Sequence, residues 1–253
     1  MESEIQRIEL LRDKLTAQNE KVLENATRHL PQVTPQIRIV NIPTGRSNIS
    51  PLSVERIEEY KNFLKQIISE ASKLSQDFEV TDSGERKAQK DLLKSETLFE
   101  RNKNLHIVSD ELCGICKGGC CANGQEHAYI TASTIRRFMN ENPSLDAAEV
   151  LDSYVGKLEK ETAEESCINQ TKTGCGLPRE MRSDSCNAYF CQELRNLHDE
   201  VNKQPITETG LLAVQRPYIH WDRESEDACT DVTSAHFVST EDVIPVEISD
   251  IEN

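Results

Sequence analysis

Through the first hundred residues, apolar side chains recur three and four positions apart, a spacing that places them on one face of a helix. Pro31 stops the first such run, and Ser53, with acidic residues in the next two turns, is a typical N-cap for the second. A turn at residues 82–84 precedes the third. The pattern predicts helices over residues 1–30, 53–78 and 85–101.

The first of these helices shows a partial heptad pattern. Polar Gln18 and Asn25 fall on its apolar seam, which leaves fewer than three clean heptads. We therefore expect an amphipathic helix packed on its own domain in preference to a coiled-coil or partner helix. The proline-rich stretch that follows, residues 31–52, predicts a linker with a short strand at QIRIV.

The second half of the chain alternates between polar loops and short periodic segments. Residues 112–125 are rich in glycine and poor in apolar side chains, so they predict a loop that wraps something other than its own core. Residues 167–185 are also loop-like. The remaining segments predict a short strand at 127–130, a helix from 131 to 139 capped by Thr131, and helices over 144–165 and 186–201. They also predict a strand within 210–221 that ends at Pro217, and a short strand over 235–239.

These elements predict a mainly α fold with a few short strands and an irregular, cysteine-rich, metal-bound centre. The order of the elements suggests three regions. Residues 1–105 form a helical N-terminal region, residues 106–201 a cysteine-cluster metal-binding domain, and residues 202–253 a short-strand region with an acidic C-terminal tail.

Composition and charge exclude several function classes. The formal net charge is −15, and the basic residues do not cluster, which disfavours nucleic-acid binding because that relies on Lys and Arg at phosphates. From Asp222 onward the chain has ten acidic residues and one basic residue, Arg223, which predicts a solvated acidic tail. No run of about eighteen apolar residues predicts a membrane span, and the N-terminus lacks a secretory h-region. We therefore expect a cytoplasmic protein without membrane contact.

Nine cysteines in such a chain require an explanation, because disulfides are rare in a reducing cytosol. Clustered cysteines in that setting favour metal binding over a disulfide framework or buried free thiols. Cys229 stands apart from the others and is expected to be a free thiol. The eight candidate metal ligands are Cys113, Cys116, Cys120 and Cys121 in a first group, and Cys167, Cys175, Cys186 and Cys191 in a second.

The spacing of these residues suits metal coordination. A Cys-x2-Cys turn directs two thiolates to one ion at about 2.3 Å, and glycines such as Gly118 permit the positive φ angles of such a turn. Adjacent side chains diverge, so Cys120 and Cys121 are expected to serve two sites, or one site and the core. The two groups should therefore interleave in space. A helix start at Cys186 would stabilise its thiolate.

Histidines and an arginine near the cysteines are further candidates for a role at a metal site. His106, His127 and His198 have donor chemistry for a metal or a proton, but with so many thiols present we expect hydrogen-bonding or surface histidines. Arg182 is a candidate to neutralise a site with several thiolates.

The stretches CGICKGGCC, YITASTIRRF and RSDSCNAYFC resemble a zinc- or iron-chelating cysteine-cluster family, YkgJ-like, often written CxxCxxCC. The resemblance covers about residues 110–195. The first motif has one extra residue before its cysteine pair, and Ser183, Asn187 and Phe190 replace the family's proline, arginine and proline. The resemblance implies metal chelation by zinc or an iron–sulfur cluster. The family also includes flagellin lysine N-methylase-like members, so an enzymatic role is implied as an alternative.

The sequence thus favours a cytosolic protein whose clustered cysteines chelate zinc or an iron–sulfur cluster. One alternative is an iron–sulfur enzyme or electron-transfer protein that modifies another protein, and whether the chain is an enzyme stays open. A Cys-x3-Cys-x2-Cys radical motif is not complete, because Asn123 stands at the third position. Another alternative is an interaction scaffold with purely structural metal and a protein partner on the N-terminal helices.

Overall fold

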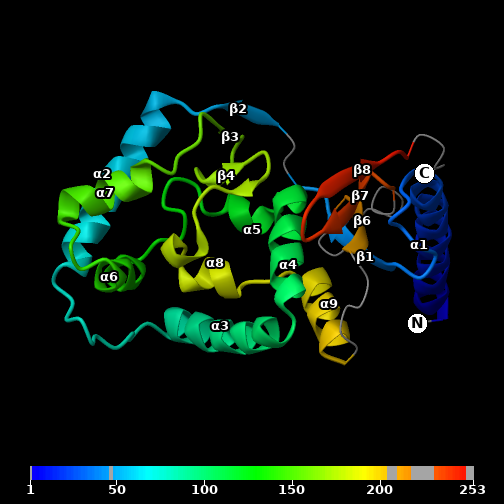
Figure 1. Cartoon of the computed structure of the whole chain (residues 1–253), viewed down its shortest axis with the longest axis horizontal. Coiled ribbons are helices and arrows are strands. Elements are labelled where there is room, and N and C mark those ends of the chain that lie inside the picture. Colours follow the sequence, from blue (N-terminus) through cyan, green and yellow to red (C-terminus); the bar gives the residue numbers. More distant parts are fainter. Residues whose placement is uncertain (1, 46–47, 204–209, 218–230, 249–253) are drawn as a thin grey trace. The chain divides into compact units, whose positions relative to one another are not determined.

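The computed structural model describes residues 2–45, 48–203, 210–217 and 231–248 (Figure 1). The chain divides into two compact units, each built from segments distant in sequence. Unit 1 comprises Met1–Gly45, Asn102–Cys116 and Cys191–Asn253, and unit 2 comprises Arg46–Arg101 and Lys117–Phe190. Helices predominate in the described residues and the strands are short, so the predicted mainly α fold is confirmed. No helix of the described ranges has the length and hydropathy needed to cross a membrane.

Unit 1 is built on a four-stranded sheet in the order β1-β6-β7-β8. Strands β6 and β7 had been predicted, and Arg38–Pro43 extends past the predicted QIRIV segment. β1 pairs in parallel with β6, and the other pairs are antiparallel. The strands are β1 (Arg38–Pro43), β6 (Gly210–Arg216), β7 (Ser234–Ser239) and β8 (Val243–Val246).

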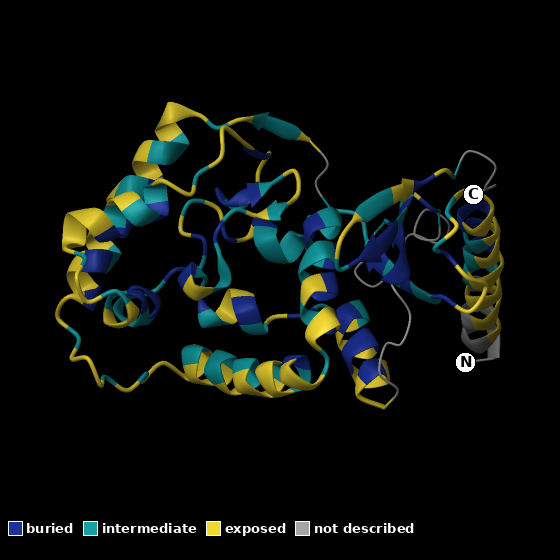
Figure 2. Ribbon diagram, in the orientation of Figure 1, coloured by how far each residue is buried: buried dark blue, intermediate teal, exposed yellow. Residues whose placement is uncertain are grey.

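Helices cover both faces of this sheet. Side chains alternate between the two faces along each strand, so both faces carry side chains that pack against helices. Leu212 and Val214 of β6 share an apolar cluster with Val22 of helix α1 (Glu2–His29). On the other face, Gln215 donates from Nε2 to the carbonyl of Ile115 in helix α4 (Lys103–Cys116) at 3.0 Å. Helix α9 (Gln192–Lys203) contacts β1. Every residue of β6 is therefore buried (Figure 2).

The most buried charge of unit 1 is Arg216, at the end of β6. Its guanidinium donates to Gln18 Oε1 at 2.6 Å, to Asn19 Oδ1 at 2.7 Å and to Asn41 Oδ1 at 2.8 Å. Burial lowers the pKa of Arg216 to about 10. The polar Gln18, which interrupts the apolar seam of α1, thus faces the sheet because it accepts a hydrogen bond from a buried cation.

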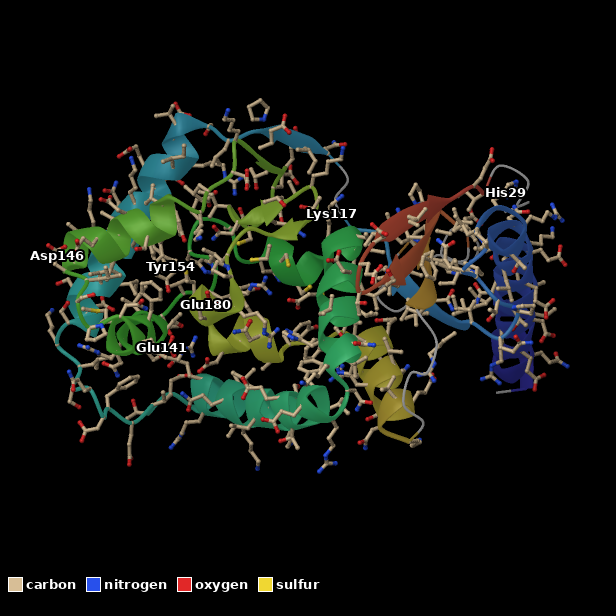
Figure 3. All side chains as sticks on the ribbon, viewed as in Figure 1. His29, Lys117, Glu141, Asp146, Tyr154 and Glu180 are labelled. Carbon is tan, nitrogen blue, oxygen red and sulfur yellow. The ribbon has the colours of Figure 1, made fainter. Side chains whose placement is uncertain are left out.

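Unit 2 is a helical assembly with two small β-pairs, and its core lies between α2, α6 and α7. Tyr154 of α7 points into this core, labelled in Figure 3, and donates to the carbonyl of Met181 at 3.1 Å. The helices are α2 (Val54–Ala71), α3 (Ser83–Arg101), α5 (Gly119–Ala122), α6 (Ala132–Glu141), α7 (Ala147–Val155) and α8 (Asp184–Ala188), with a 3-10 turn η1 (Arg179–Met181). The pairs are β2 (Ile49–Pro51) with β3 (Glu161–Ala163), and β4 (Gln170–Thr171) with β5 (Gly174–Cys175).

The predicted N-caps are confirmed, since Ser53 accepts from the N–H of Arg56 and Thr131 from that of Thr134. The C-terminal ends differ more. Helix α2 ends at Ala71 and not at residue 78, and Ser72 at its C-terminal end donates from both its N–H and its hydroxyl to the carbonyl of Ile68. Helix α7 ends at Val155 and not at residue 165, where the chain forms β3 instead.

Three further sequence predictions are wrong. Residues 112–116 belong to α4 and not to a loop, because Leu105, Val108 and Leu112 form a buried stripe at helical spacing. Residues 127–130 form turns and not a strand. The predicted helix over 186–201 is split into α8 and α9, since Tyr189 is extended. Strand β6 ends at Arg216, before Pro217, and Tyr218, Trp221 and Cys229 lie outside the described residues.

The Arg216 network predicts a large cost of substitution. Arg216→Met leaves three amide oxygens without this donor, and we expect unit 1 to lose about 3 kcal/mol of unfolding free energy. Hydrogen exchange in β6 and β7 during a urea titration measures this loss. The matched control is Arg195→Met, at an exposed position of α9, which should change stability by about 0.5 kcal/mol or less. Equal losses in the two variants would contradict this role for Arg216.

His198 of α9 predicts an acid-sensitive unit 1. It is 7% exposed, its Nε2 lies 2.9 Å from the Ser109 hydroxyl, and burial lowers its pKa to about 4. An unfolded histidine binds a proton below about pH 6.5, so the unfolded chain binds more protons between the two values. Acidification from about pH 6.5 to about pH 4 should therefore lower the unfolding free energy by at most about 3 kcal/mol.

Comparison of variants isolates this histidine from the carboxylates that titrate in the same range. His198→Gln should remove its share of the pH dependence, measured by urea unfolding at several pH values. The control His29→Gln, at an exposed position of α1, should keep the wild-type slope. Parallel slopes for wild type and His198→Gln would show that His198 does not drive the acid sensitivity.

Candidate metal centre

The eight predicted ligands divide between the two units. Cys120, Cys121, Cys167, Cys175 and Cys186 belong to unit 2, so this unit draws thiols from both sequence groups. Lys117, labelled in Figure 3, opens the first cysteine segment of unit 2. Unit 1 holds Cys113 and Cys116 on α4 and Cys191 directly before α9. None of these eight described cysteines is paired in a disulfide.

The adjacent pair Cys120–Cys121 lies in the single turn of α5. The neighbouring Cys121 side chain donates a hydrogen bond that, with backbone N–H groups, lowers the pKa of Cys120 to about 7. Tyr129 lies over the same turn, because its hydroxyl donates to the carbonyl of Cys120 at 3.0 Å. A thiol with this pKa is substantially ionised at neutral pH, and a thiolate is the form that binds metals.

The second cysteine segment is hydrogen-bonded directly to the first. The N–H of Cys167 donates to the carbonyl of Cys121 at 3.2 Å, and that of Ile168 to Gln125 at 2.9 Å. Gly124 permits this approach, since a Cβ there would lie 3.0 Å from Cys167 Cβ and 3.2 Å from its Sγ. The expected interleaving of the two groups therefore holds for the cysteines within unit 2.

Burial dominates the remaining thiols. It raises the pKa of Cys167 to about 12, and the charges of Cys175 and Cys186 act in the same direction. Burial also raises the pKa of Cys186 to about 11, although part of that residue is exposed. Burial and then the nearby thiolates raise the pKa of Tyr129. The thiols are thus close enough to influence one another's charge, and burial outweighs the expected helix-start stabilisation at Cys186.

The backbone around the cysteines is unusual. The non-glycine residues with positive φ in the described ranges lie in the cysteine segments of unit 2: Lys117, Gln125, Ala128, Tyr129 and Glu165, with φ between 37° and 56°. Gly118, expected at such an angle, has a φ of −69° instead. Residues with side chains in this region cost about 1–3 kcal/mol each and persist where the surrounding structure over-determines them, often at functional sites.

Helix α2 holds both cysteine segments in place. Arg56 donates from Nε to Glu126 Oε1 at 2.5 Å and from an Nη to the carbonyl of Ser166 at 2.6 Å. One turn further along, the fully buried Tyr60 accepts from Asn169 at 3.5 Å. Neither residue was singled out from the sequence, because nothing in the pattern distinguishes Arg56 from other arginines of a charged helix.

Helix α8 presents Cys186, and the residues that depart from the family pattern have local roles there. Ser183, in the place of a proline, caps the helix by accepting from the N–H of Cys186 at 3.1 Å. Asn187 donates to the carbonyl of Arg179 at 2.8 Å. Arg182 donates to the carbonyl of Leu177 at 2.7 Å, and its charge favours the thiolate of Cys186. The neutralising role of Arg182 at a site with several thiolates stays a prediction.

His127 and His198 have hydrogen-bonding roles, as expected from the sequence. His127 Nδ1 accepts from the N–H of Tyr129 at 3.0 Å, so the ring supports the turn beside α5. His198 pairs with Ser109 in unit 1. His106 lies 3.9 Å from Asp110.

The donor chemistry of unit 2 fits a thiophilic metal, because five thiols come from two hydrogen-bonded segments. Within the ranges that the structure describes, however, no three His, Cys, Asp or Glu side chains form a group arranged to hold a metal ion. Comparisons with protein-family models, with curated proteins and with solved structures found no match.

The close packing at Gly124 predicts a sensitive position. Gly124→Ala forces its new methyl group against Cys167 and the carbonyl of Cys121, and we expect a loss of about 1–3 kcal/mol in unit 2. Cys167 should also react faster with a maleimide, as measured by mass spectrometry. Gly84→Ala is the control, because its methyl group would meet the carboxylate of exposed Asp82. Unchanged Cys167 reactivity in Gly124→Ala would contradict the packing of the two segments.

Proposed function

We propose that this chain binds a thiophilic metal, as a zinc ion or an iron–sulfur cluster, through its clustered cysteines. The observation that carries the proposal is the meeting of both cysteine groups in unit 2, where Cys167 is hydrogen-bonded to Cys121. The resemblance of residues 110–195 to a zinc- or iron-chelating cysteine-cluster family supports the same function. The ligands of this site are drawn from Cys120, Cys121, Cys167, Cys175 and Cys186.

Binding requires the thiols to lose protons and turn toward one ion. Cys120 is the first to ionise, because its pKa is already near 7. Cys167 and Cys186 hold their protons until a metal offsets the cost of their burial, since coordination deprotonates a thiol outright. Arg182 and Arg56 contribute positive charge near these two thiols. A bound metal would cross-link the two segments and add its binding energy to folding.

Cys113, Cys116 and Cys191 complete the eight proposed ligands. They belong to unit 1, on α4 and directly before α9. The proposal assigns them to a metal on the strength of the resemblance and of their spacing, and the five thiols of unit 2 form its better supported part. Serine variants can separate the two sets experimentally.

Metal content and colour test the proposal. Anaerobically purified chain should contain zinc or iron in a fixed ratio to protein, measured by elemental analysis. A colourless protein indicates zinc, and a brown one with visible charge-transfer bands indicates an iron–sulfur cluster. Cys167→Ser and Cys186→Ser should lower the metal content at least about tenfold. Cys229→Ser, outside both groups, should retain it.

Chelation provides a second readout of the same proposal. Helices such as α2 bury apolar faces of their own, so a chelator should leave most of the helical circular dichroism intact. The cysteine segments should then become open to protease and thiol reagents, because they lose the coordination that offsets their chain entropy. Unchanged thiol reactivity, or metal content equal in all the serine variants, would refute metal binding by these cysteines.

A further inference from the structure

Helix α2 lies outside the cysteine segments in sequence, yet its side chains contact both of them. We infer that α2 is the platform of the metal site and that Arg56 is its positioning residue, which sets the distance between the two cysteine segments. The inference rests on the proposed metal binding and extends it to a residue beyond the cysteine motifs.

The geometry of Arg56 carries the inference. Its Nε donates to Glu126, five residues after Cys121, and an Nη donates to the carbonyl of Ser166, the residue before Cys167. The side chains of the Arg56–Glu126 ion pair are 21% and 25% exposed. One planar guanidinium thus joins the first segment to the second from a fixed point on a helix. Arginine suits this task because its donors are held in a rigid fork.

A second contact on the same helix supports the platform. Tyr60 follows Arg56 by four residues and so lies on the same face of α2. Its hydroxyl accepts from Asn169, two residues after Cys167. The ring of Phe63, three residues further on, contacts His127 edge-to-face with 6.2 Å between centroids. About two turns of α2, from Arg56 to Phe63, therefore contact the two segments, while α2 begins at its own cap, Ser53.

The position of Arg56 also has an electrostatic consequence. Its guanidinium lies against the carbonyl of Ser166, directly before Cys167. Thiolates gathered at a metal repel one another, and a nearby cation that is partly neutralised by Glu126 offsets this repulsion without binding the metal itself. Partners of this kind, which orient ligands without touching the metal, commonly contribute 10–100-fold to metal affinity.

The test uses the metal-free full chain titrated anaerobically with cobalt(II), whose thiolate charge-transfer and d–d bands report the ligand geometry. Zinc competition then gives the affinity. We expect Arg56→Met to weaken cobalt and zinc binding about 10–100-fold and to change the d–d spectrum. Arg56→Lys should recover part of the affinity, because lysine keeps the charge but not the fork. In the metal-free chain, Arg56→Met should also speed maleimide labelling of Cys167, because the second segment loses its hydrogen bond to α2 at Ser166 and opens to solvent.

Arg136→Met is the matched control, since the described hydrogen bond of Arg136 stays within α6, to Asn140 at 2.9 Å. It should bind cobalt like the wild type. Wild-type affinity and spectrum in Arg56→Met would overturn the inference while leaving the proposed function intact. If Arg56→Met fails to fold, Arg56→Lys decides, and a wild-type spectrum and affinity there would equally overturn the inference. A wild-type chain that binds neither cobalt nor zinc would refute both the inference and a zinc site.

Discussion

The cysteine segments of unit 2 must be held by their neighbours, because thiols and glycines supply little apolar surface of their own. Each segment is anchored by an isoleucine in the core. Ile130 follows the first segment and Ile168 lies within the second, and both are at most 3% exposed. Between these anchors the backbone is hydrogen-bonded across the two segments and to Arg56. The positive φ angles at Ala128 and Tyr129 are the conformational cost of this arrangement.

Thiol chemistry within unit 2 follows from two opposing effects. A hydrogen bond from its neighbour lowers the pKa of Cys120, whereas burial raises those of Cys167 and Cys186. Thiols on neighbouring, hydrogen-bonded segments therefore differ widely in pKa. At a site with such different pKa values, one thiolate would make the first contact with a metal. The other thiols would lose their protons only when coordination offsets the cost of their burial.

Unit 1 is under a different constraint. Its central strand β6 is buried on both faces, so every side chain there must be apolar or hydrogen-bonded. Most residues of the strand are apolar, and Arg216 donates hydrogen bonds to side-chain amide oxygens of α1 and β1. Buried cations of this kind are costly unless every donor finds an acceptor. The network accordingly explains why Gln18 and Asn19 face inward on a helix that is otherwise amphipathic.

Hydrophobic periodicity and caps determined much of the local structure, including α1, the starts of α2 and α6, and the strand at 234–239, because these depend on neighbouring residues. The cysteine clustering likewise identified the candidate ligands. The extension of α4 to Cys116, the turns at 127–130 and the break at Tyr189 depended on tertiary burial, which overrides local pattern. Only the folded chain decided that Arg56 meets Glu126 and Ser166, and that five thiols gather in unit 2. The two Arg56 contacts join residues 70 and 110 positions apart, and no local spacing encodes them.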